Sequence, residues 1–393
     1  MRLDQTKLAI ANIYDEDEID NPSANTHIQD VMSVRISRRQ ALRGGIGATT
    51  AVLLGGFGVT ACGGGDDEVQ APAALKLGFT GVAKSKLDLV TVPDGYQVSI
   101  LHSLGDPMHY GDESWKNDGS EAPESYQRRI GDGHDGMWYY GLGDDGKFKA
   151  DRSDRGLLCV NHEYVVAPYG LHPNGITAGA NRVASEVEKE INAHGVSVVE
   201  VKRGTGTDMS MVRGSRYNRR VTSATTMAFG GPVKGSGLVK TRYSADGTMT
   251  RGTNNNCANG YTPWGTYLTC EENFLNVISR AAGDDALRPA PELAALRRYG
   301  LPQARRSPYA WETAGSDDLF ARWSSSVTGA TSTDDYRNTI NTFGWVVEID
   351  PFDPASIPVK RSTLGRFNHE GAWPCNAVGG KPIVIYSGDD ARN

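Results

Sequence analysis

The sequence lacks the short motifs that identify the commonest hydrolase and nucleotide-binding classes. It contains no GxSxG elbow, no HExxH helix and no Walker loop, so serine hydrolases, zinc proteases and P-loop NTPases gain no support. Its two glycine clusters, Gly44-Gly45-Ile46-Gly47 and Gly55-Gly56-Phe57-Gly58, lie in an N-terminal segment with the features of an export signal. These glycines are therefore unrelated to dinucleotide binding.

Cysteine is scarce, and negative charge is in slight excess. The five cysteines form no CxxC pair and no zinc-finger spacing, and their spacing leaves disulfide pairing open. They are Cys62, Cys159, Cys257, Cys270 and Cys375. The formal net charge of −6 over 393 residues argues against a nucleic-acid partner, because such proteins need a basic face.

Long helical stretches are few, whereas residues that favour strands and turns are plentiful. The chain has 47 Gly, 16 Tyr and 7 Trp, a composition typical of β-rich folds with tight turns. Two segments have the spacing of helices, Asn181–Ala193 and Ala286–Tyr299. Short apolar or alternating runs predict strands at Gln97–His102, Leu157–Asn161, Val196–Val201, Thr266–Thr269, Trp345–Ile349 and Ile383–Tyr386.

The order of these segments favours an architecture dominated by β-structure. Strands without βαβ alternation suit a propeller or a sandwich better than a doubly wound sheet, although no WD or kelch signature is present. Acidic clusters follow strands near residues 163, 272 and 370. This spacing of roughly a hundred residues equals about two propeller blades of 40–50 residues each. We therefore predict a β-propeller with helical insertions.

Residues 1–62 have the features of a Tat-type export signal. Arg38 and Arg39 precede a mild, glycine-rich apolar run, Ile46–Ala61, which is shorter than the span of about 20 residues that a bilayer core needs. Cys62 ends a sequence that resembles a lipobox, so lipid anchoring and plain cleavage are both open. Residues 63–74 are predicted to be a flexible tether, and residues 75–393 the propeller domain.

The last segment is an apolar strand followed by an acidic turn that includes Asp389 and Asp390. Because no closing element follows it, we expect an incomplete propeller and a sequence that is a fragment of a longer protein. We expect little or no activity if residues 1–393 are the whole protein.

Four segments share one construction, in which a short apolar run leads into an acidic tip. The tips carry Glu163, Glu271-Glu272, Glu370 and Asp389-Asp390. Carboxylates at the ends of buried strands repel one another unless cations neutralise them. Oxygen ligands suit Ca²⁺ and Mg²⁺, and a carboxylate site with one thiolate or imidazole also holds iron or manganese. The recurrence predicts a shared metal site, whereas each tip taken alone is equally compatible with a solvated turn.

Cys270 lies between a β run and two glutamates and is the most specific single candidate. As a thiolate it would bind a metal ion. The alternative is a disulfide between Cys257 and Cys270, and the two interpretations exclude each other because a disulfide sulfur is not a thiolate ligand.

At these positions the chain resembles the PhoX-type alkaline phosphatases, a bacterial family of Tat-exported, calcium- and iron-containing enzymes built on a β-propeller. The resemblance runs from Gly136 to the end of the sequence, and its most specific part is Trp264–Asn273. The segments that carry it are Ser215–Arg220, Gly230–Pro232, Asn255–Gly260, Pro263–Asn273, Gly344–Pro351 and Gly388–Asn393.

The resemblance implies a cluster of Ca²⁺ and Fe³⁺ ions on the propeller axis. Cys270 would be the iron-bound thiolate, Glu370 a bridging carboxylate, and Arg392 a clamp for the phosphate group. These three would be the catalytic residues. The implied metal ligands are Glu163, Cys270, Glu271, Glu272, Glu370, Asp389, Asp390 and Asn393.

The implied activity is hydrolysis of phosphate monoesters by the metal cluster, without a phosphorylated side chain. The expected partners are a small phosphate-ester substrate and the Tat machinery. We expect a monomer, either periplasmic or anchored in the envelope by lipid. Two alternatives are a lactonase-like propeller hydrolase, in which calcium polarises a carbonyl, and a non-catalytic envelope lipoprotein that binds calcium for stability.

Overall fold

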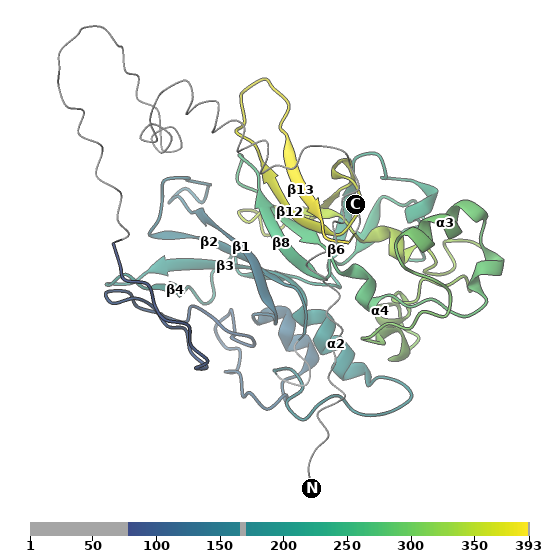
Figure 1. Ribbon diagram of the computed structural model, residues 1–393, viewed down its shortest axis with the longest axis horizontal. Coiled ribbons are helices and arrows are strands. Elements are labelled where there is room, and N and C mark those ends of the chain that lie inside the picture. Colours follow the sequence, from purple (N-terminus) through teal and green to yellow (C-terminus); the bar gives the residue numbers. More distant parts are fainter. Residues whose placement is uncertain (1–77, 166–169, 392–393) are drawn as a thin grey trace, which may run out of the picture. The chain divides into compact units, whose positions relative to one another are not determined.

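The computed structural model describes residues 78–165 and 170–391, which cluster into two units. The first unit, described from Gly78 to Val98, has no helix or strand, and its rings of Phe79 and Tyr96 meet edge to face at 5.7 Å. The second unit begins at Ser99 and holds the helices and strands of Figure 1. The predicted signal and several candidate residues lie outside the described residues: Arg38, Arg39, Cys62, Arg392 and Asn393.

The smaller sheet has five antiparallel strands and is built around β3. Its strands are β1 (His134–Gly141), β2 (Arg155–His162), β3 (Gly195–Arg203), β4 (Met209–Met211) and β5 (Arg219–Val221). Strand β2 pairs with β3 from Arg155↔Lys202 to His162↔Gly195 without a shift of register. The first seven residues of β3 are all buried, because this strand is central and covered on both faces.

The larger sheet has eight strands in the order β13-β12-β8-β9-β10-β11-β6-β7. Its strands are β6 (Thr226–Gly230), β7 (Met249–Arg251), β8 (Asn256–Tyr261), β9 (Tyr267–Glu271), β10 (Val346–Ile349), β11 (Val359–Arg361), β12 (His369–Pro374) and β13 (Ile385–Asp389). The pairs β12–β8 and β11–β6 are parallel, and the other neighbours are antiparallel.

Helices occupy a small part of the described chain. The α-helices are α2 (Ala184–Ala193), α3 (Ala290–Arg298) and α4 (Asp318–Ala321). Short 3-10 helices lie at Pro123–Arg128, Gly237–Val239, Phe274–Val277, Asp284–Leu287, Trp311–Thr313, Thr339–Thr342 and Ser362–Leu364. Figure 1 shows α3 and α4 at the opposite end of this unit from β4. Within the described residues, every helix is too short or too polar to span a membrane.

The two largest hydrophobic clusters of this unit join its main elements. In the first, side chains of the smaller sheet such as Leu157 and Val198 pack against Tyr267 and Val347 of the larger sheet. The second joins α2 and α3 to the loops around Trp311. The first core fixes the two sheets against each other, so strand ends from both sheets reach a common edge.

The predicted class, mostly β-structure with few helices, is confirmed. The two helices form, although α3 begins only after Pro289 and is preceded by a 3-10 turn. The strand predicted at Gln97–His102 is wrong, because its apolar side chains find no partner strand and Val98 and Ile100 are 52% and 82% exposed. The described residues form two sheets and no closed barrel, so the propeller stays a prediction.

Candidate metal centre

Strand pairing brings the predicted acidic tips to one edge. Across antiparallel pairs, His134 lies opposite His162, Asn256 opposite Glu271, and His369 opposite Asp389. The beginnings of β1, β8 and β12 therefore lie beside the ends of β2, β9 and β13. Because β8 and β12 are parallel, their beginnings also lie on the same side.

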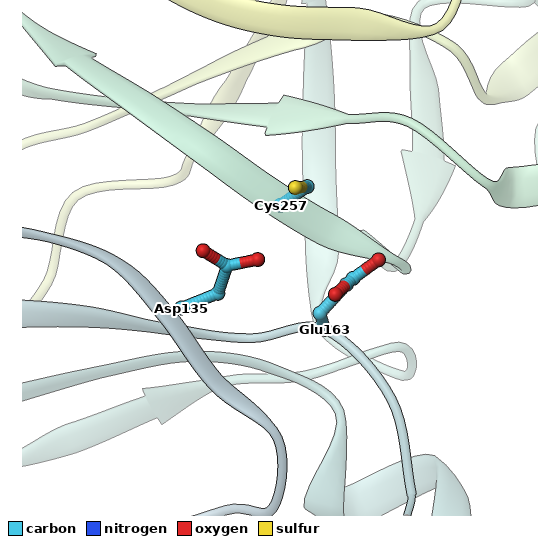
Figure 2. Close-up of side chains that lie close together, drawn as sticks. All are labelled: Asp135, Glu163 and Cys257. Carbon is cyan, nitrogen blue, oxygen red and sulfur yellow. The ribbon is translucent and has the colours of Figure 1, made fainter. Parts of the chain in front are cut away.

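Two overlapping groups of side chains meet at this edge, and Cys257 belongs to both. The first group is Asp135, Glu163 and Cys257, and the second is Cys257, Glu272 and Glu370; within each group the ligand atoms lie within 4.8 Å of one another. Figure 2 shows the first group, with the two carboxylates and the sulfur directed towards a common space. The Cys257 thiol also donates to Glu370 Oε1 at 3.6 Å.

The position of Cys257 depends on a close approach of β1 to β8. A Cβ at Gly136 would lie 2.7 Å from the carbonyl oxygen of Cys257, so only glycine lets the two backbones meet here. The amide of Asn161 donates to the same carbonyl oxygen at 2.5 Å, and its Oδ1 accepts from Tyr267 Oη and Thr269 Oγ1. Asn161 thus ties the end of β2 to both β8 and β9.

Burial and the closeness of acidic groups raise the pKa values of several side chains at this edge. Burial, then the hydrogen bond with Asp390 and the charge of Glu370, raise the pKa of Glu272 to about 8. Burial and the nearby Asp135 likewise raise the pKa of Glu163 and of the Cys257 thiol. Each shift disfavours the charged form, and a bound cation would reverse it.

The carboxylate oxygens and the single thiol at this edge fit a hard metal ion together with a second metal ion that accepts a sulfur ligand. Carboxylate oxygens suit Ca²⁺, and a single thiolate among carboxylates suits iron. Asn273 adds an amide that donates to Glu272 Oε2 at 2.8 Å and, at 3.5 Å, weakly to Glu163 Oε1. The Asn273 amide thus links Glu163 of the first group to Glu272 of the second.

Neither Cys270 nor Glu271 belongs to either of the two groups. The Cys270 side chain is buried in a small apolar cluster with Leu268 and Val346. The Glu271 carboxylate is buried against Lys360, whose Nζ lies 2.6 Å from Glu271 Oε1. The four cysteines of the described residues are free thiols, so no disulfide joins Cys257 to Cys270.

The C-terminal acids are divided. Asp390 contacts Glu272 and so extends the second group, whereas Asp389 lies opposite His369 and in neither group. The tip histidines are turned inward: His162 bonds to Ser197 and the Asp132 backbone, and His369 to Ser387 and the Gly365 backbone. Neither imidazole is a member of the groups that the described residues form.

Sequence reasoning assigned no metal role to three members of this edge: Asp135, Cys257 and Asn273. Asp135 lies inside a strand rather than after one, so it does not share the tip construction. Gly136, the next residue, permits the close approach to β8, but a glycine by itself does not reveal which strand lies against it. Cys257 is the second residue of β8 and directly follows a run of three asparagines, which is itself a polar tip.

Comparisons with known proteins show what the chain is similar to. The family model described as alkaline phosphatase PhoX matches residues 77–393. A solved structure of Pseudomonas fluorescens PhoX, in complex with vanadate, a transition state analogue, is 37% identical with a TM-score of 0.68 over 80% of this chain. The chain spans about half, 49%, of the length of that protein. No curated protein matches the sequence.

Proposed function

We propose, from the premise that this chain belongs to the PhoX alkaline phosphatase family, that it hydrolyses phosphate monoesters with metal ions held at the shared strand edge. The observation that carries the proposal is the gathering of Glu163, Glu272 and Glu370 around Cys257. Among the described residues, no lysine or arginine forms a salt bridge with these three glutamates. Since no basic side chain pairs with these glutamates, bound metal ions would have to supply the positive charge that balances them.

The ions we propose are Ca²⁺ and Fe³⁺, divided between the two groups. Asp135 and Glu163 offer oxygen ligands of the kind that Ca²⁺ prefers. Cys257, with Glu272 and Glu370, offers the sulfur that favours iron. We therefore assign the iron-bound thiolate to Cys257 in place of Cys270, whose side chain is enclosed by apolar neighbours.

The chain's own residues position this chemistry. Metal ions held by these side chains would supply positive charge for the phosphate oxygens and would lower the pKa of a water molecule as nucleophile. Asn161 holds the Cys257 backbone in place, and Asn273 holds Glu272. Glu370 is the exposed member of its group, so a phosphate ester would approach from its side. Arg392 stays a proposed phosphate clamp outside the described residues.

Vanadate gives a direct binding test. The solved relative is described as binding vanadate as a transition state analogue. We expect metal-loaded protein of this sequence to bind vanadate and to be inhibited by it competitively with phosphate esters. EDTA should abolish both binding and turnover, because the ligands alone form a negatively charged group that repels an oxyanion.

The decisive experiment combines phosphate release from p-nitrophenyl phosphate at alkaline pH with metal analysis. Cys257→Ala should lower activity at least about 100-fold and remove iron, since outer-shell changes alone cost 10–100-fold. Cys270→Ala should destabilise the protein but retain iron, and Cys375→Ala, outside the acidic groups, serves as the matched control. Iron lost from Cys270→Ala but kept in Cys257→Ala would overturn the assignment.

The same assays separate the alternatives. Activity that survives both EDTA and Cys257→Ala would end the proposed mechanism. Hydrolysis of lactones without phosphate release would favour the lactonase-like alternative. A calcium-dependent melting temperature without iron or turnover would favour a stabilising calcium site.

We also propose a β-propeller for the whole domain and export by the Tat pathway. The two packed sheets and the resemblance support the first, and Arg38-Arg39 before a short apolar run supports the second. The mature protein would act in the periplasm or on a lipid anchor at Cys62. Replacing both arginines by lysine should stop export in a fractionation assay, and Cys62→Ser should release any anchored protein.

A further inference from the structure

Three aromatic side chains from β1, β8 and β12 form one cluster. The rings of Trp138 and Tyr261 are stacked with centroids 4.5 Å apart and an interplanar angle of 7°. Trp373 meets both edge to face, at 5.5 Å and 5.7 Å. Trp138 and Tyr261 are partly buried against the core between the sheets, so the stack is a firm support for Trp373.

The cluster stands on the same three strands that carry Asp135, Cys257 and Glu370. Trp373 follows Glu370 by three residues, and its indole folds back along the strand. A Cβ at Gly371 would lie 3.1 Å from Trp373 Cδ1 and 3.2 Å from its Nε1. The indole therefore lies over the backbone of Gly371, the residue that follows Glu370.

Trp373 differs from its two partners in exposure. It remains 44% exposed although its ring touches two aromatic neighbours. An open aromatic surface beside a charged centre suits a ligand with a charged end and a planar, uncharged end. The charged end of a phosphate ester would be taken by the metal ions, and its leaving group would extend over the strands that hold them.

We propose that Trp373 is the stacking platform of a leaving-group subsite, so that esters of nucleosides and other planar aromatic alcohols are preferred over aliphatic esters. This inference rests on the proposed function. Trp138 and Tyr261 position the indole and do not contact the ligand themselves. Base–aromatic stacking tolerates any base, so the preference is for planarity and not for one nucleobase.

The first test compares kcat/KM for adenosine 5′-monophosphate and glycerol 2-phosphate in the full chain. Trp373→Ala should lower the ratio of the two values roughly tenfold, and Trp373→Phe should retain most of it. Trp264→Ala is the matched control, because Trp264 is 59% exposed on the turn that follows β8, at the opposite end of that strand from Cys257, and bonds to Glu348. Its ratio should equal that of the wild type. An equal loss for both substrates in Trp373→Ala would show a merely structural role and overturn the proposal.

The second test needs no turnover. Uncharged adenosine, titrated into EDTA-treated protein, should quench tryptophan fluorescence in the wild type and in Trp264→Ala but not in Trp373→Ala. Undiminished quenching in Trp373→Ala would refute the stacking platform. If no phosphate ester is hydrolysed at all, the proposed function fails, and this titration still decides whether the aromatic subsite exists.

Discussion

The buried ion pair between Lys360 and Glu271 provides a test of how the end of β9 is held. Both side chains are fully buried, and Lys360 Nζ lies 2.6 Å from Glu271 Oε1 and 2.7 Å from the Thr342 carbonyl oxygen. Lys360→Met removes the cation and leaves the carboxylate in the interior. Removing one partner of a buried pair costs about 3–5 kcal/mol. At roughly 2–4 °C per kcal/mol, the melting temperature should fall on the order of 10 °C.

The control for this prediction is the double variant in which Glu271→Gln accompanies Lys360→Met. Because both charges are then absent, its melting temperature should recover most of the loss, as measured by circular dichroism. If Lys360→Met melts within about 2 °C of the wild type, the pair does not stabilise the interior and the reasoning fails. If the double variant is as unstable as the sum of its parts, the two residues are not coupled.

Three further variants test the close contacts of Gly136, the hydrogen bonds of Asn161 and the ionisation of Asp335. Gly136→Ala should reduce bound iron in metal analysis, because its Cβ meets the β8 backbone at 2.7 Å, whereas Gly379→Ala, which meets no atom within 4 Å, should not. Asn161→Leu leaves hydrogen-bonding groups of β8 and β9 without their partner and should cost about 1–3 kcal/mol in urea unfolding. For pH, burial opposes ionisation, but hydrogen bonds from Arg337 hold the pKa of Asp335 at about 2, below its usual 3.8. Its contribution is therefore complete above pH 3.8 and lost towards pH 2, so Asp335→Asn should lower the melting temperature at pH 5 and flatten the decline on the acid side.

The acidic tips were predictable because they depend on local pattern. A strand that runs into a carboxylate can be recognised in a single sequence, as at Glu163 after β2 and Glu272 after β9. The same prediction is wrong for Glu370, which lies at the beginning of β12. Their meeting at one edge then follows from antiparallel pairing, which sets the end of one strand beside the beginning of the next. The gathering of acids at one edge was therefore partly predictable from the sequence, even though the fold around it was not fully specified.

Which of the two thiols, Cys257 or Cys270, lies among the carboxylates was not predictable in this way. It depends on which face of its strand each thiol takes, and a single shift of register reverses that face. Strand β8 has such a shift between Asn256 and Asn259, where Cys257 lies, whereas Cys270 sits in regular pairing with Val346. Irregular pairing is a property of two strands together and leaves no mark in either alone.

Asp135 shows a second limit, set by distance along the chain. Its place in the group follows from the approach of β1 to β8, which is made possible at Gly136. More than a hundred residues separate the two strands, and they belong to different sheets. Local propensity does not encode such an approach, because it arises only when the core between the sheets has formed.

Two neighbouring glutamates, Glu271 and Glu272, lie in contrasting electrostatic surroundings. Glu271 is buried and is matched by Lys360 within the chain. Glu272, the next residue, leaves the strand among Glu370, Cys257 and other acids, where burial raises its pKa to about 8. A side chain that served only stability would be expected to have a basic partner, as Glu271 does, because an unmatched buried acid is costly. The contrast at adjacent positions argues that the charge of Glu272 is balanced by an ion that the protein acquires.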